Sequence, residues 1–361
     1  MMIDVLTILL LLGGKMSERK EEKIIVFDIG GTYLRCGQWQ NDGTITDIVR
    51  EPSPSFITYP DDSICSLKNR LLEAILSKLP RSSGNRVGIS LGAAMNHHSG
   101  VVYGAAPLWG ACEVNFRLLD ELHAARPDVL WLLMNDVTAM AIHFASQPVC
   151  QSPRKVMLIT VSSGIACRTF TTQPFKIDFD VAGLQGEIGH LPFLDASLPL
   201  MCDCGEVGHL AAYSSGRGIQ RVYERLYEEE YHYPPAVIEH FEENFKAALN
   251  AGDIFALRVL STAMRPLADL ISTALTLEPT IDVVGLSGGI IDNLPQFVRS
   301  VLLKRMMSSG PYLTTRLSPA WLAQHIHICP PDTANGLWGA GLAASQFNEN
   351  SWMKNNIPHK G

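Results

Sequence analysis

One loop-rich segment, residues 183–218, limits the possible folds more than any other stretch of the chain. It carries His190, Cys202, Cys204 and His209 among closely spaced glycines. Two imidazoles and two thiols are the number and kind of ligands that a closed tetrahedral zinc site needs. A chelated loop also holds its shape without a hydrophobic core of its own. We therefore predict a structural zinc ion bound by these four side chains. The alternative is that the two cysteines are only small buried residues.

The composition is that of a globular protein with more than one domain. The chain has 361 residues, of which 47% are hydrophobic and 18% are charged, and this length favours two domains. A net charge of −7 offers no basic surface for DNA or RNA, so no nucleic-acid partner is expected. The cysteines lack the dense spacing of a disulfide framework, which favours a reducing compartment and predicts a cytoplasmic location.

The first residues, 1–15, form an apolar run that is too short to cross a bilayer, which needs about 20 apolar residues. The run contains Asp4 and lacks the basic start of a signal peptide, so secretion is not indicated. We predict an extension that is disordered or not native, with Met16 as the natural start. No other segment is apolar enough to predict contact with a membrane.

A glycine-rich turn joins two predicted strands near the start of the chain. Residues 24–27 are a continuous apolar run that ends at Asp28, and a second run, 34–39, follows the turn at 30–32. Glycines there would let backbone N–H groups approach a phosphate, and a carboxylate at the strand end can hold Mg²⁺ through water. The alternative is an ordinary glycine-rich hairpin.

A polar pair follows another predicted strand, residues 129–134. Asn135 and Asp136 come directly before a helical pattern at 137–146. A carboxylate at a strand end, beside a helix N-terminus, lies where ligands bind in an α/β sheet. Asp136 could then accept a proton from a substrate hydroxyl. Asn and Asp also favour helix N-caps, so the residues alone leave the two interpretations equal.

Three further segments complete the pattern. Small residues at 162–167 follow a predicted strand, and a Gly-Gly pair in 287–290 follows another; both could approach a nucleotide closely. The run at 228–233 is acidic and aromatic, and we predict that it forms a surface loop.

In order along the chain, these motifs resemble the ROK family of repressors and sugar kinases. The resemblance rests on D-x-G-G-T at Asp28, the Asn135-Asp136 pair, E-x-G-H at Glu187 and C-x-C-G at Cys202. It implies a two-lobed α/β fold of the ribonuclease-H-like, actin- and hexokinase-like kind, with a cleft between the lobes. We expect residues 16–136 and 332–350 to form the N-terminal lobe. Residues 137–331 would form the C-terminal lobe with the zinc knuckle.

The resemblance also implies roles for individual residues in an ATP-dependent sugar kinase. Asp136 would be the general base for a primary hydroxyl, and the substrate would be held by Asn135, Glu187 and His190. ATP and Mg²⁺ would be bound by Asp28, Gly30, Gly31, Thr32, Ser163, Gly164, Gly288 and Gly289. The family often forms dimers, so a homodimer is expected.

Two departures from the family pattern bear on function. The second phosphate loop keeps only Gly164 of the usual glycines, and Ala211 replaces a glutamate that touches the sugar in the family. Alanine cannot accept a hydrogen bond, so we expect an amino or N-acyl sugar, a deoxy sugar or a cyclitol in preference to glucose. The alternative is a sugar-binding protein of the same fold with little or no kinase activity.

A chain that starts at Met16 should keep full activity and gain solubility, because the apolar run precedes every motif. Expression and activity of this shortened chain, compared with those of the full chain, test the expectation. Insoluble or inactive shortened protein would show that residues 1–15 pack into the fold.

Overall fold

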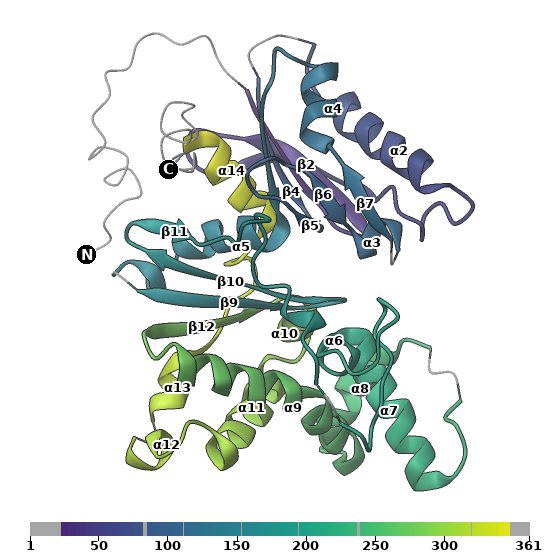
Figure 1. Ribbon diagram of the computed structural model, residues 1–361, viewed down its shortest axis with the longest axis vertical. Coiled ribbons are helices and arrows are strands. Elements are labelled where there is room, and N and C mark those ends of the chain that lie inside the picture. Colours follow the sequence, from purple (N-terminus) through teal and green to yellow (C-terminus); the bar gives the residue numbers. More distant parts are fainter. Residues whose placement is uncertain are drawn as a thin grey trace.

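The computed structural model describes residues 23–346, except 82–84, 111, 153, 194, 237–238 and 319. It has two α/β lobes, each built on a five-stranded sheet (Figure 1). The predicted extension, 1–15, and the expected lobe residues beyond 346 lie outside the described part. Within that part, none of the helices combines the length and the apolar character that crossing a membrane requires.

The two sheets have the same topology. The first has the order β3-β2-β1-β4-β8 and the second the order β11-β10-β9-β12-β13. In each, three antiparallel strands come first, and two further strands then pair in parallel. This repeated arrangement confirms the expected ribonuclease-H-like fold.

The first sheet consists of β1 (Ile24–Ile29), β2 (Tyr33–Trp39), β3 (Ile45–Pro52), β4 (Arg86–Leu91) and β8 (Leu130–Asn135). The second consists of β9 (Lys155–Val161), β10 (Ile165–Thr172), β11 (Phe175–Ile177), β12 (Ile281–Ser287) and β13 (Ile326–Ile328). A small sheet in the first lobe contains β5 (Ala94–Met95), β6 (Val102–Gly104) and β7 (Glu113–Phe116). A short helix, α3 (Ala106–Trp109), lies between β6 and β7.

Helices cover both faces of the first sheet. On one face α2 (Ile64–Ser77) and α4 (Leu118–Ala125) bury their leucines against alternate residues of β1 and β4. On the other face α14 (Gly336–Gln346) packs against β1 and β4. The period-2 alternation of β1 therefore sends Phe27 to the α2 side and Val26 to the α14 side.

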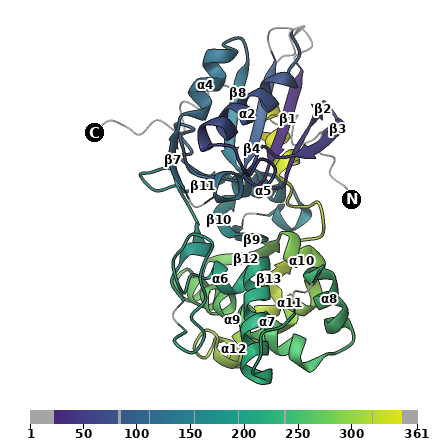
Figure 2. The same cartoon turned by 90° about the vertical axis from the view of Figure 1, so that its right-hand side faces the viewer.

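The outer face of the second sheet carries most of the helices of the second lobe (Figures 1 and 2). They are α6 (Ala211–Ser214), α7 (Gly216–Tyr231), α8 (Phe241–Asn250), α9 (Ile254–Leu277), α10 (Gly289–Asn293), α11 (Pro295–Ser309), α12 (Thr314–Leu317) and α13 (Trp321–His325). Two 3₁₀ turns, η1 (Pro148–Cys150) and η2 (Ile188–His190), complete the described elements.

Helix α5 (Asp136–Ala145) lies between the two sheets together with α14 (Figure 1). Its residues Ala141 and Phe144 pack against Val156 and Leu158 of β9. The lobe boundary that we predict at residue 136 thus falls at the start of a helix that contacts both lobes. The boundary itself stays a prediction.

The predicted surface loop at 228–233 is wrong for most of its length, because α7 continues to Tyr231. Tyr223, Tyr227 and Tyr231 are four residues apart, so their rings lie in contact along one face of the helix. The helix ends at His232, whose φ of 61° is left-handed. The acidic residues between the tyrosines hid this stripe in the sequence.

Candidate active site

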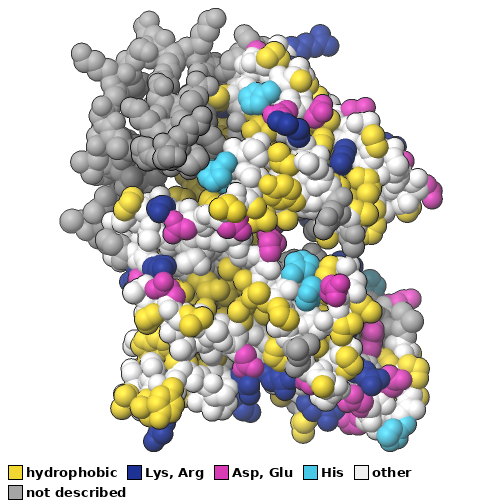
Figure 3. All heavy atoms as spheres, viewed as in Figure 1, with side chains coloured by type: hydrophobic (Ala, Val, Ile, Leu, Met, Phe, Trp, Pro, Cys, Tyr) yellow, Lys and Arg dark blue, Asp and Glu magenta, His cyan; other side chains and the backbone are white. Residues whose placement is uncertain are grey.

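A cavity of about 260 Å³ opens between the two lobes. Its walls come from the ends of β1 and β12, the start of α5, helix α10 and the segment before α14. Figure 3 shows an indentation in the molecular surface between the upper and lower lobes. Ligands of open α/β sheets bind at the carboxyl ends of strands, so this cavity is the candidate active site.

Asp28 forms one wall of the cavity and is held in a fixed orientation. It lies on the α14 side of β1 because the strand alternates. Arg35 of β2 donates to Asp28 Oδ2 from Nε at 3.2 Å and from Nη2 at 2.5 Å, and Ser90 Oγ donates to Oδ1 at 2.6 Å. A Cβ at Gly336 would overlap the side chains of both Asp28 and Ser90, so any other residue where α14 begins would displace the Asp28 carboxylate.

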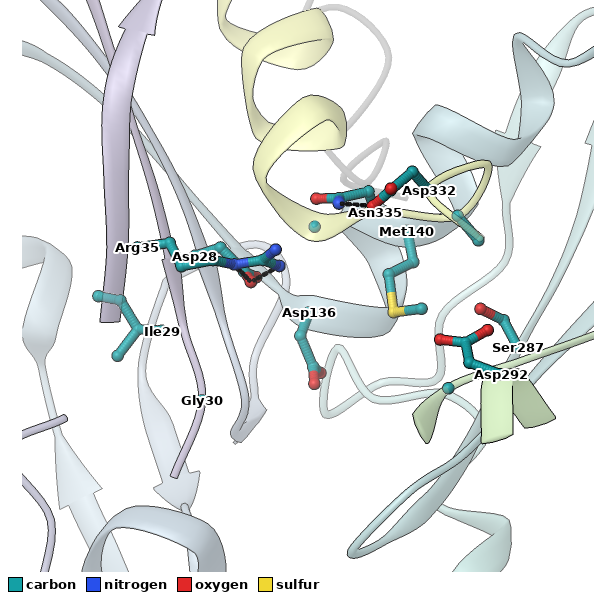
Figure 4. A pocket seen from close by; sticks show the side chains of 13 residues that line it. Asp28, Ile29, Gly30, Arg35, Asp136, Met140, Ser287, Asp292, Asp332 and Asn335 are labelled. Carbon is teal, nitrogen blue, oxygen red and sulfur yellow. Dashed lines mark hydrogen bonds and ion pairs between the residues drawn. The ribbon is translucent and has the colours of Figure 1, made fainter. Parts of the chain in front are cut away.

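The cavity is rich in acidic groups. Asp28, Asp136, Asp292 and Asp332 line it, and Figure 4 shows them on separate elements around one space. Among the described lining residues, Arg35 is the single Lys or Arg. Carboxylates in this number suit a hard cation such as Mg²⁺, which uses oxygen ligands and water.

Asp136 is the first residue of α5 and projects into the cavity (Figure 4). Burial and, to a smaller degree, the nearby charge of Asp28 together raise the pKa of its carboxyl to about 7, against the lowering effects of the Val137 backbone N–H and of Arg168. A general base is most effective when its pKa lies near the working pH. Its position and its pKa both fit that role.

Asn135 is the N-cap of α5. Its side-chain oxygen accepts from the backbone N–H of Val137 at 2.9 Å, from that of Thr138 at 3.3 Å and from Arg168 Nη2 at 2.6 Å. Its amide nitrogen donates to Ala93 O at 2.9 Å. The oxygen is thus fully used inside the protein, and only the second amide hydrogen is left for a substrate.

The segment that carries Glu187 is packed tightly on β10. Cβ atoms at Gly186 and Gly189 would overlap the backbone of Cys167 and Ile165, respectively. Burial raises the pKa of the Glu187 carboxyl, whereas the charge of Arg168 lowers it. The glycines of this segment therefore fix where Glu187 lies relative to the second sheet.

The four predicted zinc ligands come together in the structure. The ligand atoms of His190, Cys202, Cys204 and His209 all lie within 4.8 Å of one another. Cys204 Sγ is 3.2 Å from His209 Nδ1. Tetrahedral zinc ligands lie about 3.3–3.8 Å apart, given metal–ligand distances of about 2.0–2.3 Å, so the group needs only a small contraction to hold the ion.

The expected phosphate-binding turns differ in their distance from the cavity. Gly30 and Gly288 line it, with Gly31 and Thr32 in the same β1–β2 turn as Gly30. Gly288 has a φ of 102° and packs on Val161, and Gly289 begins α10. Ser163 and Gly164 form the exposed β9–β10 turn and are not among the residues that line the cavity.

A small second cavity lies on the other side of α10. Its lining includes Ile290 of α10, Ile219 of α7, and Phe241 and Phe245 of α8. Helix α10 therefore contributes residues to both cavities, and the second is lined mainly by apolar side chains together with Glu242 and Asn293.

Sequence analysis missed several residues of the site. The strongest omissions are Arg35 on β2 and Arg168 on β10, together with Asp292 and Asp332 of the cavity wall. The two arginines could have been found because each is a charged residue within an otherwise largely apolar strand segment.

The sequence profile of the ROK family matches residues 24–326. The chain belongs to the ROK family. A 2-epi-5-epi-valiolone 7-kinase of an Actinoplanes species is 41% identical to this ROK protein over 345 residues, which are 91% of this chain and 94% of that relative. A C(7)-cyclitol 7-kinase of Streptomyces hygroscopicus subsp. jinggangensis is 31% identical over 274 residues, which are 70% of this chain and 75% of that relative.

A solved ROK family glucokinase from Streptomyces griseus, in complex with glucose and AMPPNP, has the same fold as this ROK protein. Its TM-score is 0.67 at 17% sequence identity, and the match covers 90% of this chain and 100% of that chain. Together the comparisons confirm the expected family, the fold and the class of enzyme, an ATP-dependent kinase for a sugar or sugar-like alcohol. Such an enzyme uses ATP and Mg²⁺.

Activity should depend on pH through Asp136. Because a base acts in its ionised form, kcat/KM should rise with pH through about 7 and level off above it. Asp136→Asn should lower kcat by about 10²–10⁴-fold, lose this dependence and still bind the acceptor. ADP release across pH and acceptor binding by calorimetry measure both effects. Wild-type-like turnover in folded Asp136→Asn protein would contradict the assignment.

Proposed function

We propose that this ROK kinase transfers the γ-phosphoryl group of ATP to the primary hydroxyl of a C7-cyclitol. The observation that carries the proposal is the similarity to two relatives named as cyclitol 7-kinases, which extends over 91% and 70% of the chain. A carboxyl with a pKa near 7 at the cavity wall supports the same chemistry.

Asp136 is the base in this proposal. The acceptor hydroxyl donates a hydrogen bond to its carboxylate and passes the proton to it as the oxygen attacks phosphorus. In phosphoryl transfer the protein contributes mainly positioning and charge stabilisation. The start of α5 supplies the positioning, because hydrogen bonds from the Val137 backbone N–H to the side chains of Asn135 and Asp136 fix this turn.

The nucleotide extends along the Gly288–Gly289 turn in this proposal. The phosphates lie in the acidic cavity, near Gly30 and Arg35. The adenine ring lies at the second cavity, against Ile290 and Phe245; this cavity has a volume of about 20 Å³ and would have to widen to hold the ring. Mg²⁺ would be held through water by Asp28, and when bound it neutralises phosphate oxygens. Arg35 offsets part of the remaining negative charge.

The acceptor ring lies on the side of Glu187 and His190. The Ala211 methyl group packs beside Gly189 of that segment, where the family has a sugar-binding glutamate. A cyclitol has neither the ring oxygen nor the anomeric carbon of a sugar. A small apolar side chain there suits a carbocycle better than it suits glucose.

Zinc is structural in this proposal. The four ligands leave no open coordination position for catalysis. A bound zinc ion would orient His190 through one ring nitrogen and leave the other for the acceptor. Thiolate ligands need a reducing compartment, which agrees with the expected cytoplasmic location. The homodimer remains a prediction from the family.

Steady-state kinetics should show a preference for the cyclitol. With 2-epi-5-epi-valiolone, kcat/KM should exceed that for glucose by about tenfold to a hundredfold, because an unpaired buried hydroxyl costs about 1–3 kcal/mol. Ala211→Glu should narrow the gap by improving glucose use. Ala196→Glu, at an exposed position of the same segment, is the matched control. A higher kcat/KM for glucose than for the cyclitol would overturn the substrate assignment.

Metal analysis should find one zinc ion per chain. His209→Ala should lose most of the metal, whereas His123→Ala on the exposed face of α4 should retain it. Removal of the ion should lower Tm, since a structural site contributes to folding. Metal-free protein that keeps its full Tm after chelation would disprove the site.

A further inference from the structure

Arg168 is a buried cation that belongs to none of the sequence motifs. It lies on β10 and is only 3% exposed. Its guanidinium donates to Thr138 Oγ1 at 2.9 Å, to Asn135 Oδ1 at 2.6 Å, to Cys167 O at 2.8 Å and to Gln185 O. All four acceptors are neutral.

A buried charge is costly unless an opposite charge compensates for it. Among the described residues Arg168 forms no ion pair. Burial lowers its pKa, and the charges of Glu187 and Asp136 act in the opposite direction. The buried cation thus lies near the carboxylates of Glu187 and Asp136 but forms a hydrogen bond with neither. Its cost in stability suggests that it serves the function of the site.

The hydrogen bonds show what Arg168 joins. One arm reaches Asn135, the neighbour of Asp136, and another reaches Gln185, two residues before Glu187. The side chain of Gln185 in turn accepts from Thr169 N of β10 at 2.8 Å. A guanidinium is planar and presents its donors in a fixed fork, so it sets the separation of these two segments.

We propose that Arg168 is a positioning residue for the acceptor. It fixes the distance between the segments that carry Asp136 and Glu187, so that both carboxylates can contact the same acceptor molecule. This inference rests on the proposed kinase function. Arg168 is not among the residues that line the nucleotide cavity, so ATP binding should not depend on it.

Kinetics of two variants test the proposal. Arg168→Met removes the fork and the charge, and we expect kcat/KM for the acceptor to fall by about 10²-fold, the loss that a small misplacement of reacting groups causes. The acceptor KM should rise while the KM for ATP stays within about twofold of wild type. Arg168→Lys keeps the charge without the fork, so it should recover only part of the activity.

Two controls separate positioning from lost stability. Arg305→Met removes an ordered arginine that bonds Asp269 far from the site, and Leu302→Ala destabilises the core of α11. Both should leave the acceptor KM unchanged when assayed well below Tm. Equal rises of both KM values in Arg168→Met, an unchanged acceptor KM, or full activity in Arg168→Lys would overturn the proposal.

The same measurements distinguish this inference from the proposed substrate. The variants are assayed with 2-epi-5-epi-valiolone and with glucose, and each KM is compared with the wild-type value for the same acceptor. Wild-type enzyme that phosphorylates only glucose would overturn the cyclitol assignment alone. Variants that behave like Arg305→Met with either acceptor would overturn the role of Arg168 alone.

Discussion

The junction of β8 and α5 is the constraint on which the rest of the site depends. The strand is fixed by parallel pairing with β4, which brings Asn135 beside Leu91. The helix is fixed by packing between the two sheets. The turn between them therefore has little freedom, and Asn135, as the N-cap, accepts hydrogen bonds from the first backbone N–H groups of the helix, which have no partner within the helix itself. Asp136 inherits a fixed position at the cavity wall from this packing.

The electrostatics follow from the same geometry. The end of β1, the start of α5, helix α10 and the segment before α14 collect four carboxylates around one cavity. Burial and, after it, the nearby charge of Asp28 raise the pKa of Asp136 to about 7. Two arginines offset this charge in different ways. Arg35 bonds directly to Asp28 at the cavity surface, whereas Arg168 lies behind the carboxylates and bonds to the segments that carry them. The resulting acidic cavity with a nearby arginine supports the proposed site for the nucleotide and Mg²⁺.

Much of the fold and part of the site could be predicted from local patterns. Apolar runs that end in Asp28 and Asn135 indicated strands β1 and β8, and the E-x-G-H and C-x-C-G motifs indicated ligands that do converge. These signals are local because alternation, tight turns and chelation need only near neighbours. Local polarity also caused the wrong prediction of a surface loop at 228–233. The acidic residues suggested a loop, whereas the tyrosines between them lie on one face of α7.

The sequence by itself determined the family, the order of its motifs along the chain and the candidate residues for the active site. Only the tertiary structure decided which charges are buried and what they join. Arg168 meets Asn135 across 33 residues and Gln185 across 17, and Asp28 meets Gly336 from opposite ends of the described chain. The cost of burying a charge depends on partners supplied by distant elements, and no local pattern contains that information.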